Sequence, residues 1–295
     1  MKKITPVLIT AAMLPFMIAC NSGDESVKTE DSAAHDHHTM ANTADYFMEL
    51  ATNPATIEPG KEVTLSLTPK NRSAASEQVA LETENEKKIH LIVVSDDLSW
   101  FEHLHPEYQP DGSYLVKAKF PAAGRYKAFA DYKPSGGSQQ VDKLEIEVAG
   151  TPKAPVRFSG DKLSGKSGNY SFTIEPTGGK LITGVLLHLS GIVKKDGKEI
   201  DANTLDNYLG SKAHFVLISL NEKEYLHVHP TVSGGQFDLH TTFEKPGIYR
   251  GWVQFNAEGQ LHTIDFTMNV AQGSDEDIRK ANQSHTEKHT GSHQH

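Results

Sequence analysis

The sequence predicts an all-β protein made of two tandem, homologous β-sandwich domains. Three observations lead to this prediction: a long internal repeat, a two-residue period of apolar side chains, and frequent Gly and Pro turns. The length of 295 residues fits two domains, because a typical domain has roughly 150 residues. An apolar fraction of 37% is sufficient for a buried core in each domain.

The internal repeat is the strongest of these signals. Residues 90–106 (HLIVVSDDLSWFEHLHP) align without a gap with residues 214–230 (HFVLISLNEKEYLHVHP), at an offset of 124. The match continues from residues 113–132 to residues 236–255 at an offset of 123. Similarity at a nearly constant offset over this length indicates two copies of one domain.

Within each copy the apolar residues recur with the period of a β-strand. In the first copy, for example, Val63, Leu65 and Leu67 alternate with polar residues, as in a strand with one buried face. Gly and Pro residues interrupt these runs at intervals of roughly ten residues, which is typical of a sandwich. We therefore expect about seven strands in each domain, at 45–150 and 151–272, with an immunoglobulin-like or cupredoxin-like arrangement.

Residues 1–20 are predicted to be a lipoprotein signal peptide. Two lysines precede an apolar run that is too short and too interrupted by proline to predict a membrane span. The run ends in MIAC, which resembles a bacterial lipobox, whose cysteine (here Cys20) is lipidated and becomes the mature N-terminus. Asn21 in place of Asp favours a lipid anchor in the outer membrane of the bacterial cell envelope. An ordinary secretory signal with an incidental cysteine is the alternative.

The segments at both ends of the two domains lack the apolar residues that a core requires. Residues 21–44 consist mainly of Ser, Asp, Glu, Thr and Ala, and residues 273–295 have a similar character with several histidines. Such segments cannot bury enough surface to offset the entropy lost on ordering. We expect a disordered tether at 21–44 and a disordered, His-rich tail at 273–295.

The charge and cysteine content exclude some classes of partner and chemistry. The chain has 29 basic and 38 acidic residues, a net charge of -9, and no run of Lys or Arg. This balance argues against a nucleic-acid partner. The single cysteine excludes an intramolecular disulfide and any CxxC zinc or redox motif.

The second copy carries an ordered series of motifs that resembles a known family. The series comprises YLG at 208–210, His214, HVHP at 227–230, GIYR at 247–250 and LHT at 261–263. It resembles an exported bacterial family with YtkA-like, immunoglobulin-type domains, and the first copy is similar to the companion unit of that family. The resemblance implies an envelope protein that is linked with the handling of copper or other heavy metals.

The spacing of three histidines in the first copy predicts a shared face. If residues 90–95 and 100–106 form an antiparallel hairpin, His90 lies directly opposite His105. His103 is then the diagonal neighbour of His90, and it shares the face of His105 because side chains alternate along a strand. All three imidazoles would lie within about 5–8 Å of one another at their Cβ atoms.

The second copy repeats this pattern with His214, His227 and His229. Three imidazoles on one face are a known ligand set for Zn(II) or Cu(II), and the Irving–Williams order favours copper. We therefore expect a copper or zinc site in each domain, up to two ions in all, and no organic cofactor. His262 follows a Gly turn on the last strand and is a possible fourth ligand in the second domain.

A purely structural role for the same histidines is the alternative. Their strand faces also carry apolar residues such as Ile92 and Val216, which we assign to the sandwich core. Converging, exposed nitrogens would favour a metal, whereas buried histidines bonded to carbonyl groups would favour structure. His188 is expected to be a core or edge residue, and His240 to lie on an exposed face.

Catalysis has little support in the sequence. GxSxG, HExxH and phosphate-loop motifs are absent, and no acidic residue occupies equivalent positions beside both HxH pairs. We expect a non-enzymatic, lipid-anchored protein that handles copper or zinc, attached to the membrane and served by a metal-transfer partner protein. The alternatives are a non-catalytic interaction or adhesion module and, third, a metal-dependent oxidase or hydrolase.

Overall fold

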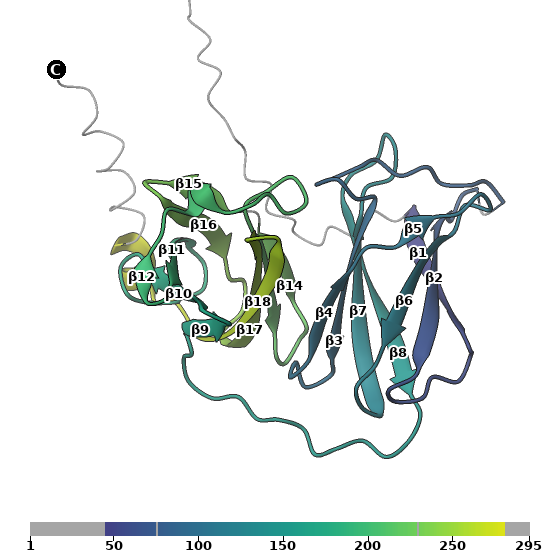
Figure 1. The fold of residues 1–295 in the computed structure, drawn as a ribbon, viewed down its shortest axis with the longest axis horizontal. Helices are drawn as coiled ribbons and strands as arrows, with labels where there is room; N and C mark the ends of the chain where they lie inside the picture. The colour runs from purple at the N-terminus through teal and green to yellow at the C-terminus, as the bar shows by residue number, and fades with distance from the viewer. Residues whose placement is uncertain (1–44, 75, 229, 281–295) are drawn as a thin grey trace, which may run out of the picture. The chain divides into compact units, whose positions relative to one another are not determined.

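The structure, a computed structural model, describes residues 45–74, 76–228 and 230–280 (Figure 1). These residues form two β-sandwich domains in tandem, which confirms the predicted all-β class and the duplication. The predictions for the signal peptide with Cys20, for the tether at 21–44, for the side chain of His229 and for residues 281–295 lie outside the described part.

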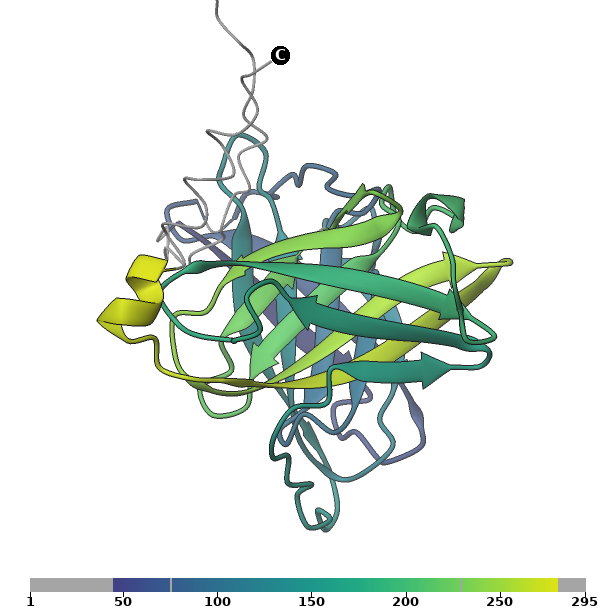
Figure 2. The same cartoon turned by 90° about the vertical axis from the view of Figure 1, so that its left-hand side faces the viewer.

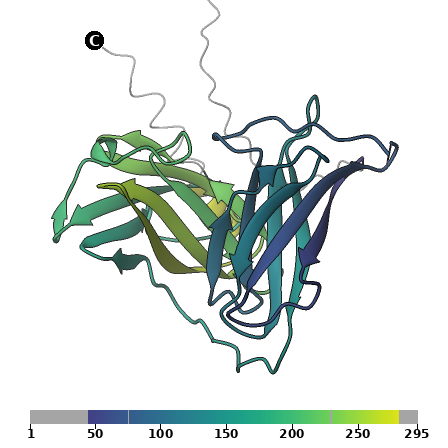
Figure 3. The same cartoon turned by 45° about the vertical axis from the view of Figure 1, so that its right-hand side comes forward.

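The first domain consists of two antiparallel four-stranded sheets, with strand orders β1-β2-β6-β5 and β4-β3-β7-β8. Figures 1 and 3 show these sheets face to face. The apolar side chains between them include Leu65, Leu91 and Tyr114 and are buried. The strands are β1 (Tyr46–Asn53), β2 (Glu62–Asn71), β3 (Ile89–Ser95), β4 (Phe101–Leu104), β5 (Glu107–Tyr108), β6 (Tyr114–Lys119), β7 (Gly124–Tyr132) and β8 (Gln140–Val148).

The second domain repeats this arrangement and adds strands at the edge of one sheet. Its sheets have the orders β15-β16-β11-β10-β9, with β12 also paired to β11, and β14-β13-β17-β18. In Figure 2 the sheet that contains β11 and β16 faces the viewer. The elements are β9 (Ser164–Ser167), β10 (Tyr170–Pro176), β11 (Leu186–Lys195), β12 (Lys198–Glu199), η1 (Ala202–Thr204), β13 (His214–Ser219), β14 (Tyr225–Val228), β15 (Thr231–Ser233), β16 (Gln236–Thr242), β17 (Gly247–Ala257) and β18 (Gln260–Val270).

The topology is of the immunoglobulin type in both domains. The sheet β1-β2-β6-β5 of the first domain corresponds to β10-β11-β16-β15 of the second. The sheet β4-β3-β7-β8 corresponds in the same way to β14-β13-β17-β18. Each domain also has a tyrosine corner: Tyr126 donates to the carbonyl of Ala122 at 2.9 Å, and Tyr249 donates to the carbonyl of Lys245 at 2.9 Å. Equivalent corners in both copies resolve the two predicted alternatives in favour of the immunoglobulin-like arrangement.

Part of the expected C-terminal tail is ordered. Residues 275–280 are helical, and Ile278 packs against the core of the second domain. Ser274 caps this turn, because its hydroxyl accepts from the backbone N–H of Asp277 at 3.1 Å and donates to the Asp277 carboxylate at 2.7 Å. Lys180 also pairs with the Asp277 carboxylate at 3.0 Å, so an apolar contact, a cap and an ion pair join this turn to the second domain, although its composition alone predicts disorder. Among the described residues, no helix has the length and apolar character to cross a membrane.

Candidate metal centre

The predicted register of both histidine hairpins is confirmed. β3 and β4 pair antiparallel with Ile92 opposite His103, and β13 and β14 pair with Val216 opposite His227. Both pairings are those that place the histidines of each hairpin on one face. The local geometry therefore follows from the spacing of the residues in the sequence.

Three imidazole nitrogens of the first domain converge. Nδ1 of His90 lies 3.1 Å from Nε2 of His103, and Nε2 of His105 lies 3.1 Å from the same His103 nitrogen. One ligand nitrogen from each of the three residues lies within 4.8 Å of the other two. A metal bound at about 2.0–2.1 Å with tetrahedral angles would hold its ligand nitrogens about 3.3 Å apart. The observed separations are close to that value.

The other nitrogens of these rings are held by hydrogen bonds that fix the tautomer. Nε2–H of His90 donates to the carbonyl of Glu84 at 3.0 Å, and Nδ1–H of His103 donates to Oε1 of Gln254 at 2.8 Å. Because a neutral imidazole has a single N–H, each ring then turns a lone pair toward the other. Two lone pairs that face each other at 3.1 Å repel unless a proton or a metal ion lies between them. Outer hydrogen bonds of this kind are typical of metal-ligating histidines.

Histidines of the second domain join the same group. The ring centroid of His214 lies 5.8 Å from that of His90 and 5.9 Å from that of His103. The centroid of His227 lies 5.6 Å from that of His90 and 5.8 Å from that of His214. His90, His103, His105, His214 and His227 are called here the interdomain histidine cluster. The predicted triad of the first domain is therefore present, and His214 and His227 of the second domain lie beside it. The predicted triad of the second domain includes His229, which lies outside the described residues, so a separate site there stays a prediction.

The histidines of the second domain are oriented in the same way as those of the first. Nε2–H of His214 donates to the carbonyl of Tyr208 at 3.1 Å. Nδ1–H of His227 donates to Oδ2 of Asp131 at 2.9 Å, and both of these side chains are 3% exposed. A metal held by these two residues would therefore be held through Nδ1 of His214 and Nε2 of His227.

Two reciprocal hydrogen bonds cross between the domains. Asp131 lies opposite His90 in the β3–β7 ladder, and Gln254 lies opposite His214 in the β13–β17 ladder, so the two occupy equivalent positions. Asp131 of the first domain accepts from His227, whereas Gln254 of the second accepts from His103. Each copy thus orients a histidine of the other, as in the self-complementary interface of a two-fold dimer.

Aromatic stacking follows the same reciprocal pattern. Phe101 stacks on Trp252 with ring centroids 4.7 Å apart, and Phe129 stacks on Tyr225 at 4.9 Å. These rings belong to a buried apolar group shared by both domains, which also contains Ile92, Val94, Val216 and Ile218. The sequence assigned these apolar residues to the core of each sandwich, and the structure places them in the interface instead.

Burial favours the neutral form of four of the clustered imidazoles, those of His90, His103, His105 and His214. It lowers the pKa of His105 to about 3 and the pKa of His214 to about 3, and in both cases a neighbouring histidine adds to the shift. The same two causes lower the pKa of His90 and lower that of His103 well below its usual value. Metal coordination requires neutral imidazole, so these four rings have the required protonation state without a metal.

Asp131 places a carboxylate next to the interdomain histidine cluster. Burial opposes its ionisation, but the hydrogen bond and charge of His227 lower its pKa, and Gln139 donates a further hydrogen bond to its other oxygen. A buried carboxylate that accepts from Nδ1–H raises the basicity of the ligating nitrogen and supplies a negative charge next to a cation. Asp131 lies 26 or more positions from any HxH motif, so no local spacing in the sequence points to it.

His262 is not part of the cluster. It pairs with Phe255 in the β17–β18 ladder, one position from Gln254, and therefore lies on the opposite face of the sheet. Its ring packs 4.5 Å from that of Tyr170, and Nδ1 is 3.1 Å from the hydroxyl of Ser167. The proposed fourth ligand is thus placed inside the second sandwich. His188 and His240 lie on β11 and β16, on the outward face of that sandwich.

Fold and repeat together define a protein of two tandem immunoglobulin-type domains with a histidine cluster where they meet. The chain belongs to the family described as "Domain of unknown function (DUF8832)", which matches twice, at residues 41–150 and 165–272. No curated protein matches the chain.

Several solved structures of β-sandwich proteins are similar to the chain at low identity. The FdeC adhesin of Escherichia coli is 13% identical over 76% of this chain, with a TM-score of 0.24, and the chain spans 64% of that structure. The fibronectin(III)-like modules of Clostridium thermocellum CbhA are 14% identical, with 77% and 95% of the two chains covered and a TM-score of 0.21. A carbohydrate-binding module of the β-sandwich superfamily is 10% identical, with 78% and 93% covered and a TM-score of 0.24.

Proposed function

We propose that this protein binds a transition metal ion, copper first and zinc second, at the interdomain histidine cluster. The observation that carries the proposal is the pair of lone pairs on His90 and His103, which face each other at 3.1 Å because both outer nitrogens donate elsewhere. A cation between them removes the repulsion. His105 supplies a third nitrogen beside the same point.

The donor set favours borderline metal ions. All five members of the cluster are imidazoles, which suit Zn(II) and Cu(II). The order of affinities for nitrogen ligands places copper above zinc. The nearby carboxylate of Asp131 offsets part of the positive charge that the ion brings into a buried site.

The proposed location is the bacterial cell envelope, with Cys20 as the lipidated residue that anchors the protein to the outer membrane. A metal-transfer partner protein would then deliver or receive the ion. Cys20→Ala is expected to abolish labelling by a radioactive or alkyne-tagged fatty acid and to release the protein from the membrane fraction. Unchanged membrane attachment of the variant, with no label on the wild type, would contradict the proposed anchor.

A second candidate function is a non-catalytic interaction module with structural histidines. The favouring observations are the burial of His90 and His214 and their hydrogen bonds to the carbonyl groups of Glu84 and Tyr208. In the ring of His90, one nitrogen is bonded to a carbonyl group and the other converges on a neighbouring histidine. Bonding to carbonyl groups therefore does not distinguish a structural histidine from a metal ligand in this protein.

Calorimetric titration with Cu(II) and Zn(II) separates them. The protein is the full chain in which the histidines of both termini are replaced by serine, so that uptake by these segments does not count; they are His35, His37, His38, His285, His289, His293 and His295. Metal binding predicts saturable uptake at neutral pH and a rise of the unfolding midpoint with metal concentration. The structural function predicts no saturable uptake by the cluster. His105→Asn then has a lower stability than the wild type in metal-free buffer, and added metal changes the stability of neither protein.

A further inference from the structure

The outward face of the second domain carries another set of metal-ligand side chains, separate from the interdomain histidine cluster. In the β11–β16 ladder, His188 lies opposite His240, and Ser190 lies opposite Asp238. Both strands alternate buried and half-buried residues, and these four belong to the half-buried, outward-facing set. Two histidines and one aspartate therefore lie close together on one face of the β11–β16 pair, in two neighbouring cross-strand pairs.

The distances within this set are those of potential ligands. The ring centroids of His188 and His240 are 4.0 Å apart, and Nε2 of His240 is 3.1 Å from Oδ1 of Asp238. One ligand atom from each of the three residues lies within 4.8 Å of the other two. An ion that binds here would therefore require only small side-chain movements.

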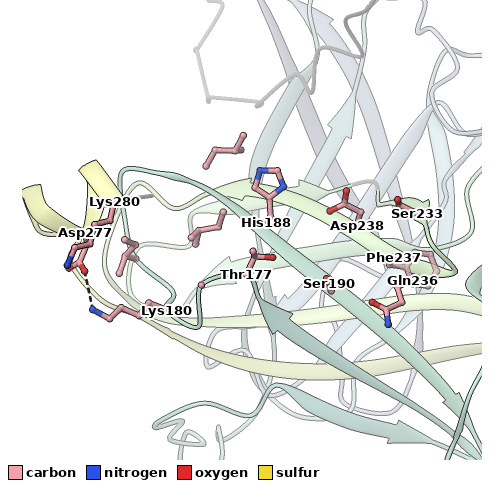
Figure 4. A pocket seen from close by; sticks show the side chains of 14 residues that line it. Thr177, Lys180, His188, Ser190, Ser233, Gln236, Phe237, Asp238, Asp277 and Lys280 are labelled. Carbon is pink, nitrogen blue, oxygen red and sulfur yellow. Dashed lines mark hydrogen bonds and ion pairs between the residues drawn. The ribbon is translucent and has the colours of Figure 1, made fainter. Parts of the chain in front are cut away.

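A pocket opens beside these residues. It has a volume of about 700 Å³, and its wall includes His188, Asp238 and Ser190 (Figure 4). Thr177 and Gln236 add further polar groups to the wall. Two of the three ligands, His188 and Asp238, thus line a space next to the set, whose wall combines polar and apolar side chains.

The first domain shows that the fold does not require these residues. In its equivalent strand pair, β2–β6, Thr64 lies opposite Lys117, and Ser66 lies opposite Leu115. By the offset of 123 between the copies, Lys117 is the counterpart of His240, and Leu115 is the counterpart of Asp238. The ligand set occurs on one copy alone, whereas the HxH hairpins occur on both.

We propose that His188, Asp238 and His240 form a second metal site, for a first-row divalent ion with open positions that water or a small polar ligand fills. Two imidazoles and one carboxylate are the protein ligands of zinc sites that keep a fourth position open, and of facial Fe(II) sites. The half-exposed position suits a labile ion that exchanges with solvent. The proposal does not depend on metal binding at the interdomain histidine cluster.

The test is titration with Zn²⁺, with Co²⁺ absorption as a second readout, on the full chain without terminal histidines. We expect His240→Asn and Asp238→Asn each to remove one binding event or to weaken it at least tenfold. Thr242→Ala, on the same face of β16 but outside the pocket wall, is the matched control and leaves binding unchanged. Equal uptake by the wild type and both ligand variants would overturn the proposal, as would an unchanged Co²⁺ spectrum.

A reciprocal experiment adds the site to the first domain. The triple change Thr64→His, Leu115→Asp and Lys117→His places the same three side chains at the equivalent register positions. We expect one additional Zn²⁺ per chain, with circular dichroism confirming the unchanged fold. A folded triple variant without additional uptake would overturn the claim that these three residues suffice. Loss of the outward-face ion with retention of the cluster ion, or the converse, distinguishes the two sites.

Discussion

The interdomain histidine cluster and the outward-face set differ in how they are assembled. The cluster combines duplicated motifs from both domains, is buried, and depends on Asp131 and Gln254, which cross between the domains. The outward-face set comes from one strand pair of one copy and is half-exposed. Duplication therefore placed equivalent residues so that they meet across an interface, whereas the outward-face set depends on residues that occur in one copy alone.

The largest effect should follow from removing one ligand of the cluster. His103→Asn in the first domain is expected to abolish tight Cu(II) binding by the whole cluster, because His103 Nε2 is the atom that both His90 and His105 approach. His227→Asn in the second domain should weaken the same single binding event. Calorimetry gives the number of ions bound by each variant. Retention of a complete, independent site in the unmutated domain would show that the hairpins act separately after all.

The interface itself should contribute strongly to stability. Trp252 is 4% exposed and stacks on Phe101, so Trp252→Ala removes most of a large buried side chain from the apolar group that both domains share. We expect a loss of about 3–5 kcal/mol in the free energy of unfolding. Chemical denaturation without metal measures this loss. Phe129→Ala, the equivalent change in the other copy, provides the comparison, and a loss below about 1 kcal/mol in both would contradict a packed interface.

The sequence predicted the class of fold, the duplication and the register of both hairpins, but not the meeting of the hairpins. Register follows from local spacing, because side-chain direction alternates along a strand. The interface depends on which outer faces pack together. One signal was present: HLIVVS and HFVLIS are almost continuously apolar in both copies, which indicates strands buried on both faces. Leu91 lies in the core of the first sandwich, whereas Ile92 lies in the interface.

The metal-free protein should lose stability in mild acid. In the unfolded chain, His105 and His214 bind protons with a pKa near 6.5, whereas in the folded protein each has a pKa of about 3. The unfolded state therefore binds more protons between pH 6.5 and 3, and stability falls as the pH falls through that window. We expect at most about 2 kcal/mol from each histidine at pH 5.

Denaturant unfolding at pH 7, 6 and 5 measures this dependence. His105→Asn should have a shallower slope than the wild type, because the variant lacks one of the shifted groups. Glu107→Gln, an exposed change two residues away, is the control and should leave the slope unchanged. A wild-type stability that is constant from pH 7 to 5 would mean that the histidines are protonated as readily in the folded protein as in the unfolded chain.

The smallest effect concerns the difference between the two orienting residues. Asp131 and Gln254 occupy equivalent positions, but only Asp131 carries a charge, so His227 should be the more basic ligand once a metal is bound. Asp131→Asn preserves size and removes the charge, and we expect Cu(II) affinity to fall about tenfold. Gln254→Glu adds a carboxylate at the equivalent position beside His103. This change should raise the affinity of the cluster for Cu(II). Calorimetry on both variants, with circular dichroism to confirm folding, tests the pair. If the charge-removing change left affinity unaltered, the carboxylate would be a structural partner of His227 and not a tuning group for a bound ion.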